Sequence, residues 1–171
     1  FAGNDFLARI CKEWEAIAIT KTKNTRLIIL RIGIVLGPDG GALKKMLPVF
    51  KMGLGGPIGN GKQWMSWIHR TDLCRVIENA LINSSWKGSL NCVAPKPTQM
   101  LQFTSALGST LGRPSIFPVP AQILKLILGD GAKVVLEGQK VKPKVLEDFG
   151  FKFQYPDLNQ ALSAATKQGK H

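Results

Sequence analysis

An aliphatic run of ten residues is the feature that most constrains the fold of this chain. Residues 27–36 read LIILRIGIVL, and the run stops at the turn-forming sequence GPDGG. Only Arg31 and Gly33 depart from its aliphatic character. A half-exposed strand would alternate apolar and polar residues, whereas a continuous run is typical of a strand that helices cover on both faces. We therefore predict a central parallel strand over residues 27–36.

Helical and strand patterns alternate along the rest of the chain. The predicted helices cover residues 4–20, 42–51, 71–81, 98–111, 121–128, 141–148 and 158–166, and the predicted strands cover residues 63–68 and 89–93. In the first helix the apolar spacing predicts one buried face. Pro48 is expected to disturb the second helix, and Thr98 and Gly112 are expected to cap the two ends of the fourth. This alternation predicts an α/β fold.

Charge and cysteine content exclude several classes of function. The net charge of +12 comes from 23 basic and 11 acidic residues spread over the whole chain, without a basic cluster interleaved with aromatics, so we expect no nucleic-acid partner. Apolar runs fall well short of the roughly 20 residues that span a bilayer, and we expect no membrane partner. Three separated cysteines and two histidines offer no metal-site spacing. A soluble, non-secreted protein is expected.

A glycine-dense loop follows the second predicted helix. Residues 53–61 read GLGGPIGNG, and glycine at this density marks backbone that turns tightly or approaches another group closely. Lys62 is followed by Gln63 rather than by Ser or Thr, so the phosphate-loop pattern is incomplete. We interpret residues 53–61 as a structural or substrate loop rather than as a nucleotide cradle.

A set of motifs distributed over the chain resembles one family. The motifs are NDFLARICKEWE at 4–15, RIGIVLGPDGGAL at 31–43, GPIG at 56–59, QWMSWIH at 63–69, DL at 72–73, APKP at 94–97, PVP at 118–120, VLEGQKV at 135–141 and GF at 150–151. They resemble the C-terminal half of the atypical, epimerase-like extended short-chain dehydrogenase/reductases. Members are named as NAD(P)-dependent sugar-nucleotide epimerases or as cell-division inhibitors, and the sequence is most similar to cyanobacterial and chloroplast members.

The resemblance implies the C-terminal part of a Rossmann-type doubly wound sheet plus a small α/β substrate-side subdomain. We assign residues 1–53 to the remnant of the dinucleotide-binding domain and residues 54–171 to the substrate-side region. The cofactor implied is NADP or NAD, and the partner implied is a small-molecule substrate. Since the glycine-rich turn that holds the pyrophosphate in this family is absent from the sequence, we expect a fragment that is not competent alone. We also expect a homo-oligomer, in the bacterial cytoplasm or the chloroplast stroma.

Four positions depart from the family's pattern. Its Tyr and Lys, which shuttle a proton during hydride transfer, correspond to Leu7 and Cys11, and neither can replace them. We expect Cys11 to be a buried core cysteine. The family's asparagine near the nicotinamide corresponds to Ile34, and the arginine that holds a diphosphate corresponds to Met65. The resemblance therefore implies a more apolar pocket than that of a nucleotide-sugar enzyme.

Six residues are candidates for the site. His69 lies where a predicted strand meets a helix, and it is either the catalytic acid/base or a residue that hydrogen-bonds the backbone to fix that turn. The substrate-binding candidates are Trp67 and Asp72, although Asp72 also suits the first turn of a helix. The cofactor-binding candidates are Arg31, Gly33 and Ile34.

For some of these residues a structural role is the alternative to a role in the site, and for the whole chain there is an alternative function. Arg31 needs a carboxylate or a ligand phosphate, and Glu15 is expected to form a salt bridge. Of Trp64 and Trp67, one is expected in the core and the other at a pocket wall.

The leading hypothesis is the substrate-side part of an NAD(P)-dependent epimerase or oxidoreductase. The alternative is a non-catalytic binding or regulatory protein that keeps the fold without the Tyr/Lys pair.

Overall fold

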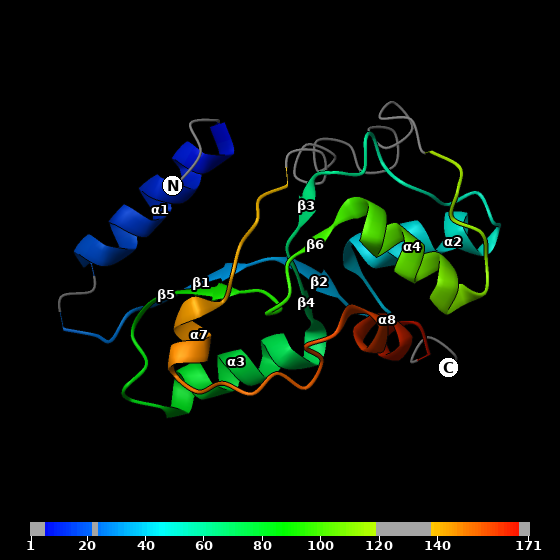
Figure 1. Cartoon of the computed structure of the whole chain (residues 1–171). Helices are drawn as coiled ribbons and strands as arrows, with labels where there is room; N and C mark the ends of the chain where they lie inside the picture. Colours follow the sequence, from blue (N-terminus) through cyan, green and yellow to red (C-terminus); the bar gives the residue numbers. More distant parts are fainter. Residues whose placement is uncertain (1–5, 22–23, 119–137, 168–171) are drawn as a thin grey trace.

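The computed structural model describes residues 6–21, 24–118 and 138–167, and their helices and strands alternate as predicted (Figure 1). In chain order the elements are α1 (Phe6–Lys21), β1 (Ile28–Ile32), β2 (Ile34–Leu36), α2 (Gly41–Lys51), β3 (Trp64–Met65), β4 (Trp67–His69), α3 (Arg70–Ile82), β5 (Gly88–Cys92), β6 (Thr98–Gln99), α4 (Met100–Leu111), α7 (Lys144–Asp148) and α8 (Leu158–Lys167). The helix predicted over residues 121–128 lies outside the described residues.

The aliphatic run forms parallel pairs as predicted, but it does so as two strands rather than one. β1 pairs with β5 and β2 pairs with β4, both in parallel. The break falls at Gly33, whose backbone passes so close to two neighbours that a Cβ there would lie 2.7 Å from the Ser66 carbonyl oxygen and 2.9 Å from Val93 Cγ1. The run therefore changes partner at the one residue that has no side chain.

The strand predicted over residues 63–68 is likewise divided. Ser66 separates β3 from β4, and its hydroxyl donates to the carbonyl oxygen of Gln139 at 2.7 Å. β3 pairs with β6 in an antiparallel arrangement while β4 joins β2. The two pairings thus meet at a residue that bonds a segment 73 residues away, which no pattern within residues 63–68 indicates.

The ends of α4 differ partly from the prediction. Gln99, not Thr98, is the N-terminal cap, and Gln99 and Gln102 form a reciprocal capping box. Thr98 instead lies in β6, where its hydroxyl accepts a hydrogen bond from the indole of Trp67. At the other end the prediction is confirmed, because Gly112 adopts the left-handed conformation with φ of 63° and closes the helix.

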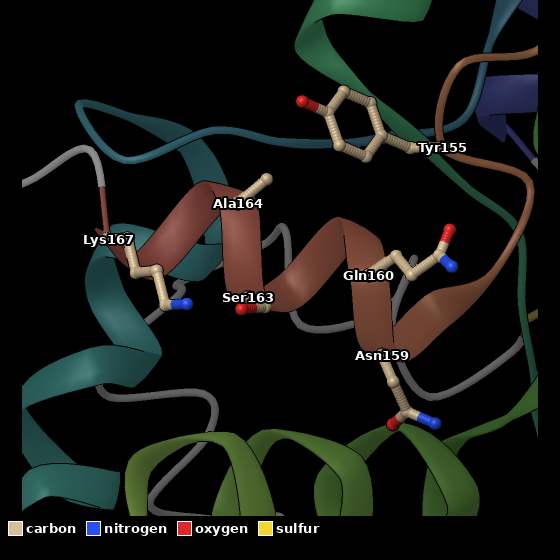
Figure 2. Close-up of a pocket in the computed structure, with 6 residues that line it drawn as sticks. All are labelled: Tyr155, Asn159, Gln160, Ser163, Ala164 and Lys167. Carbon is tan, nitrogen blue, oxygen red and sulfur yellow. The ribbon is translucent and has the colours of Figure 1, made fainter.

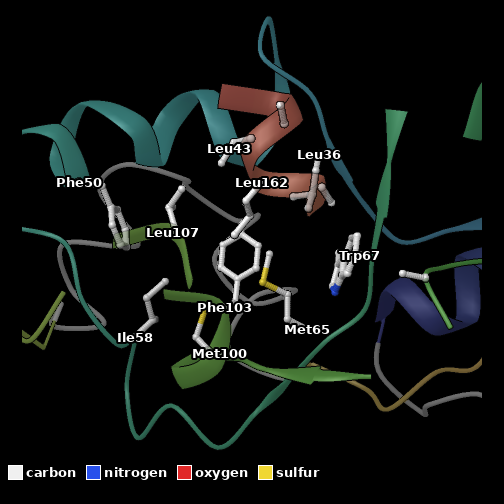
Figure 3. Packing of buried hydrophobic residues seen from close by; sticks show 13 residues of the cluster. Leu36, Leu43, Phe50, Ile58, Met65, Trp67, Met100, Phe103, Leu107 and Leu162 are labelled. Atoms are coloured by element: carbon white, nitrogen blue, oxygen red, sulfur yellow. The ribbon is translucent and has the colours of Figure 1, made fainter. Parts of the chain in front are cut away.

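The core consists of two hydrophobic clusters. The first lies among α2, β2, α4 and α8 (Figure 3), and its largest members are Leu36, Leu43, Phe50, Met65, Trp67, Met100, Phe103, Leu107 and Leu162. The second lies between the β1–β5 pair and α3, α7 and the segment after α7; it contains Ile68, Val76, Trp86, Leu90, Cys92, Leu146 and Phe151. The first cluster draws residues from both sides of position 53, and the domain division there stays a prediction.

α1 is helical as predicted, but the prediction of a buried apolar face is wrong for the described chain. Trp14 is 70% exposed and Ile17 is 57% exposed. Cys11, expected in the core, is exposed as well. In Figure 1, α1 lies above β1 and β5, and neither core cluster includes a described residue of α1. The apolar periodicity of α1 is real, and no described element packs on the face that carries Trp14 and Ile17.

Candidate functional site

The site candidates gather at the end of β4 and the start of α3. Trp67 and His69 are both 1% exposed and lie on one face of β4, two residues apart. Register places Trp67 beside Ile34 and His69 beside Leu36 in the neighbouring strand β2. The structure therefore brings Ile34, Trp67, His69 and Asp72 together.

Trp67 belongs to the first hydrophobic cluster. Its ring packs with the buried side chains around Phe103, and its indole nitrogen donates to the Thr98 hydroxyl at 3.2 Å. Trp64 is only half-buried and carries the ammonium of Lys140 over its ring at 4.4 Å from the centroid. One of the two tryptophans was predicted to lie in the core, and that residue is Trp67. The N–H of its buried indole already has a hydrogen-bond partner in Thr98.

His69 caps α3 through its ring. Its Nδ1 accepts a hydrogen bond from the backbone N–H of Thr71 at 3.2 Å, so in the neutral ring the proton lies on Nε2. Nε2 is buried, and no hydrogen-bond partner for it exists among the described residues. Burial lowers the pKa of His69; the nearby carboxylate of Asp72 acts in the opposite direction. The backbone-bonding role considered for His69 is present in the structure.

The ring of Tyr155 covers His69. The two ring centroids lie 4.0 Å apart, with the planes tilted by 41°. Tyr155 comes from the segment between α7 and α8, far later in the chain. Sequence reasoning missed this contact because nothing in the residues around Tyr155 indicates a partner so distant in sequence.

Asp72 of α3 binds the segment between α7 and α8 through hydrogen bonds. Its side chain is fully buried; Oδ1 accepts the backbone N–H of Gln154 at 2.7 Å, and Oδ2 accepts that of Tyr155 at 2.9 Å. Arg75 donates to Oδ1 at 3.2 Å and to the carbonyl of Lys152 at 2.7 Å. Both carboxylate oxygens are therefore engaged by the protein itself, and the predicted substrate-binding role of Asp72 has to compete with this anchoring role.

The polar groups of the three cofactor candidates already have partners within the chain. Arg31 forms a two-pronged ion pair with Glu15 at 2.8 and 2.6 Å, as the salt-bridge alternative predicted. This hydrogen bonding lowers the pKa of Glu15 and raises that of Arg31. Gly33 donates its N–H to the Cys92 carbonyl, and Ile34 donates to that of Ser66. Their geometry is that of packing and strand pairing, and it offers no phosphate cradle.

A shallow pocket lies along α8, and Tyr155 is one of its lining residues (Figure 2). It encloses about 600 Å³ and is lined by Tyr155, Asn159, Gln160, Ser163, Ala164 and Lys167. None of these residues is among the sequence candidates; Tyr155 has Asn159 rather than a lysine four residues on, so it does not match the family's Tyr/Lys pattern. Tyr155 thus both contacts the buried His69 ring and lines this pocket.

Metal chemistry and membrane spanning find no support in the part of the chain that the structure describes. Among those residues no three His, Cys, Asp or Glu side chains converge as metal ligands, and no helix is both long and apolar enough to cross a bilayer. Burial raises the pKa of the Cys92 thiol to about 11. That thiol therefore stays protonated near neutral pH and is a poor nucleophile.

Comparison with known proteins gives a consistent family. The C-terminal residues 119–165 match a family described as Domain of unknown function (DUF1731). The Arabidopsis thaliana protein named epimerase family protein SDR39U1 homolog, chloroplastic, is 50% identical over 95% of this chain and 47% of its own length. The crystal structure of human epimerase family protein SDR39U1 (isoform 2) with NADPH superposes with a TM-score of 0.90 and 37% identity, over 97% of this chain and 57% of the human chain.

Over nearly all of its length this chain is similar to proteins named as epimerase family proteins. The predicted fold class is confirmed: the chain has the C-terminal part of a Rossmann-type α/β fold. A nucleoside-diphosphate sugar epimerase from Corynebacterium glutamicum also superposes, with a TM-score of 0.73 and 30% identity over 96% of this chain and 31% of that one. The chain spans about half the length of the curated relatives it matches.

Proposed function

We propose that this chain is the substrate-side half of an NAD(P)-dependent oxidoreductase or epimerase that acts on a small organic molecule, and that it is not competent alone. The observation that carries the proposal is the similarity, over 97% of the chain, to a protein whose structure was solved with NADPH. A second structural relative is named as a nucleoside-diphosphate sugar epimerase. We propose the chloroplast stroma or the bacterial cytoplasm as its compartment, which the chloroplastic Arabidopsis relative and the bacterial relatives support.

Dinucleotide binding cannot be assigned to the described residues. A dinucleotide pyrophosphate needs free backbone amides at a helix N-terminus or a free cation. Here Arg31 is paired with Glu15, and the amides of Gly33 and Ile34 donate to backbone carbonyls. Arg70, next to His69, forms an ion pair with Asp39. These residues do not fit the cofactor, and we propose that its main contacts lie in the half of the relatives that this chain does not match.

Within the proposal, the residues of this chain shape the substrate side. Met65 is buried in the first core cluster, where a diphosphate would have no cation to meet, so we propose a substrate without that group. The unpartnered Nε2 of His69 favours a proton-transfer role, since a buried N–H or ring nitrogen without a partner is costly unless a ligand satisfies it. The cap to Thr71 and the contact with Tyr155 favour a positioning role instead.

A non-catalytic binding protein is the second candidate. One observation favours it: Leu7 and Cys11 occupy the positions of the family's Tyr and Lys, so α1 carries no acid/base pair. In that case the protein would bind a cofactor or ligand without turning it over. The two candidates differ in whether a substrate is converted, either with net oxidation of NADPH or by epimerisation without net consumption of the cofactor; they do not differ in whether NADPH binds.

Substitution of His69 separates the candidates. The test protein is this sequence joined to the portion of the Arabidopsis relative outside the match, assayed for NADPH oxidation with a panel of small carbonyl compounds. If His69 moves the proton, His69→Gln lowers turnover by about 10²- to 10⁴-fold and leaves NADPH affinity within a few-fold. If His69 only positions Tyr155, the variant melts at a lower temperature and turnover per folded molecule is unchanged. A protein that neither oxidises NADPH with any carbonyl nor converts any panel compound to its epimer supports the non-catalytic candidate.

A further inference from the structure

The segment that leads into α7 is held by hydrogen bonds at two places. At the first, the Ser66 hydroxyl donates to the Gln139 carbonyl oxygen at 2.7 Å and accepts the N–H of Val141 at 3.3 Å. At the second, the side-chain amide of Asn91 in β5 donates to the Lys142 carbonyl oxygen at 3.3 Å. In Figure 1 the orange trace follows this segment from the side of β3 down to α7.

These bonds place the segment at the carboxyl ends of parallel strands. Asn91 lies opposite Arg31 in the β1–β5 register, and each is the next-to-last residue of its strand. Ile34, two residues after the end of β1, donates its N–H to the carbonyl oxygen of Ser66 at 2.8 Å. In open α/β sheets, ligands bind outside the carboxyl ends of the strands. The segment therefore crosses the part of the fold where a ligand is expected.

Lys140, in the middle of this segment, is held over the ring of Trp64. Its ammonium lies 4.4 Å from the ring centroid; Lys140 is exposed and Trp64 is half-buried. A Cβ at Gly138 would collide with the Trp64 carbonyl oxygen, so the glycine allows the segment to lie directly against β3. The ring and the two Ser66 bonds orient the ammonium before a ligand arrives, which lowers the entropy cost of binding one.

The ammonium of Lys140 has no carboxylate partner in the part of the chain that the structure describes. The ion pairs there join other side chains. Residues 40–71, which include Trp64, contain no Asp or Glu, and neither do residues 138–146. An ammonium offers three N–H donors and no acceptor. A single oriented cation beside an aromatic ring therefore suits an anionic group that is attached to an apolar or planar body.

We propose that Lys140 binds a carboxylate of the substrate and that Trp64 contacts the apolar part beside that carboxylate. Trp64 then forms the pocket wall predicted for one of the two tryptophans. The substrate is a small carbonyl or hydroxy compound with one carboxylate, and this inference rests on the proposed function because it names the substrate class. One ammonium balances one carboxylate, whereas a pyrophosphate carries more charge than that. A phosphate group of the cofactor is the competing source of the anion.

Matched acid and amide probes test the site in the joined protein, which is this sequence fused to the unmatched portion of the Arabidopsis relative. The probes are benzoate with benzamide and pyruvate with pyruvamide, and ligand-detected NMR follows their binding with and without NADP⁺. At least one acid should bind at least about tenfold more tightly than its amide. Lys140→Gln should abolish that preference, and Lys140→Arg should retain most of it. Lys144→Gln is the matched control, because Lys144 is exposed and lies in the same basic stretch.

Three results would overturn the proposal. The first is a folded joined protein without a preference for either acid. The second is a preference that survives Lys140→Gln or is lost equally in Lys144→Gln. The third concerns the cofactor: Lys140→Gln should leave NADPH affinity within about threefold, and a loss of about tenfold or more would assign the ammonium to a cofactor phosphate.

Amine acylation of the unsubstituted joined protein gives a second test. A carboxylate beside an ammonium favours its charged form, which does not attack an acylating reagent. A saturating acid probe should therefore slow acylation of Lys140 at least about threefold more than acylation of Lys144 in the same molecule, and equal slowing would contradict the proposal.

The same measurements separate this inference from the proposed function. Acid binding through Lys140 in a protein that neither binds NADPH nor converts any compound would refute the proposed function and leave the carboxylate site standing. Oxidation of NADPH with uncharged carbonyl compounds, without a preference for acids, would support the proposed function and refute the carboxylate site.

Discussion

Asp72 should be one of the most costly polar residues to replace. Its fully buried carboxylate accepts the backbone N–H groups of Gln154 and Tyr155 and a bond from Arg75. Asp72→Asn keeps the shape but replaces one acceptor oxygen with an NH₂ donor. One backbone N–H then faces a donor, which costs about 1–3 kcal/mol, and the remaining bond loses its charge, which costs about 1 kcal/mol. The free energy of unfolding should fall by about 2–4 kcal/mol.

Denaturant unfolding of the wild type and Asp72→Asn measures this loss directly. For a chain of this size the melting temperature should fall by roughly 5–15 °C. Asp39→Asn is the matched control, because Asp39 forms an exposed ion pair with Arg70 and should change stability by less than about 1 kcal/mol. If Asp72→Asn costs less than about 0.5 kcal/mol, the anchoring role is refuted, and the substrate-binding role predicted for Asp72 gains support.

Substitutions at three further positions test separate contacts. Gly33→Ala places a Cβ 2.7 Å from the Ser66 carbonyl oxygen and should destabilise by about 1–3 kcal/mol in denaturant unfolding; a neutral result would refute the close packing there. Arg26 donates to three carbonyls at the end of α3 and just after it, so Arg26→Met should cost about 1–3 kcal/mol, and Arg26→Lys should restore part of that stability. Burial lowers the pKa of His69, so the unfolded state takes up its proton first as the pH falls. Stability should therefore fall as the pH drops below about 6.5, and His69→Gln should remove the part of that slope that His69 contributes. An unchanged slope would assign it to other groups.

The sequence predicts the elements better than it predicts their partners. The parallel strand type of residues 27–36 follows from the aliphatic run, and α8 and the left-handed cap at Gly112 follow from local patterns. The break at Gly33 does not, because it depends on how closely the Ser66 carbonyl approaches. A local pattern carries no information about a backbone group so far along the chain.

The same limit applies to the candidate site. Asp72 and His69 could be selected because they stand at a strand-to-helix junction. Their contacts with Gln154 and Tyr155 could not, because these join segments more than 80 residues apart. The buried face predicted for α1 failed for a related reason: periodicity shows that a helix face is apolar, but not which element covers it.

Calorimetric titration of NADPH into the chain alone tests most directly the proposed division of roles, in which the two halves bind substrate and cofactor separately. In that division this half supplies the substrate side and not the main cofactor contacts, since Arg31 is paired and the Gly33 and Ile34 amides are used within the fold. We predict no binding heat for the chain alone, and micromolar binding once it is joined to the unmatched portion of the Arabidopsis relative. Micromolar binding by the chain alone would contradict that division.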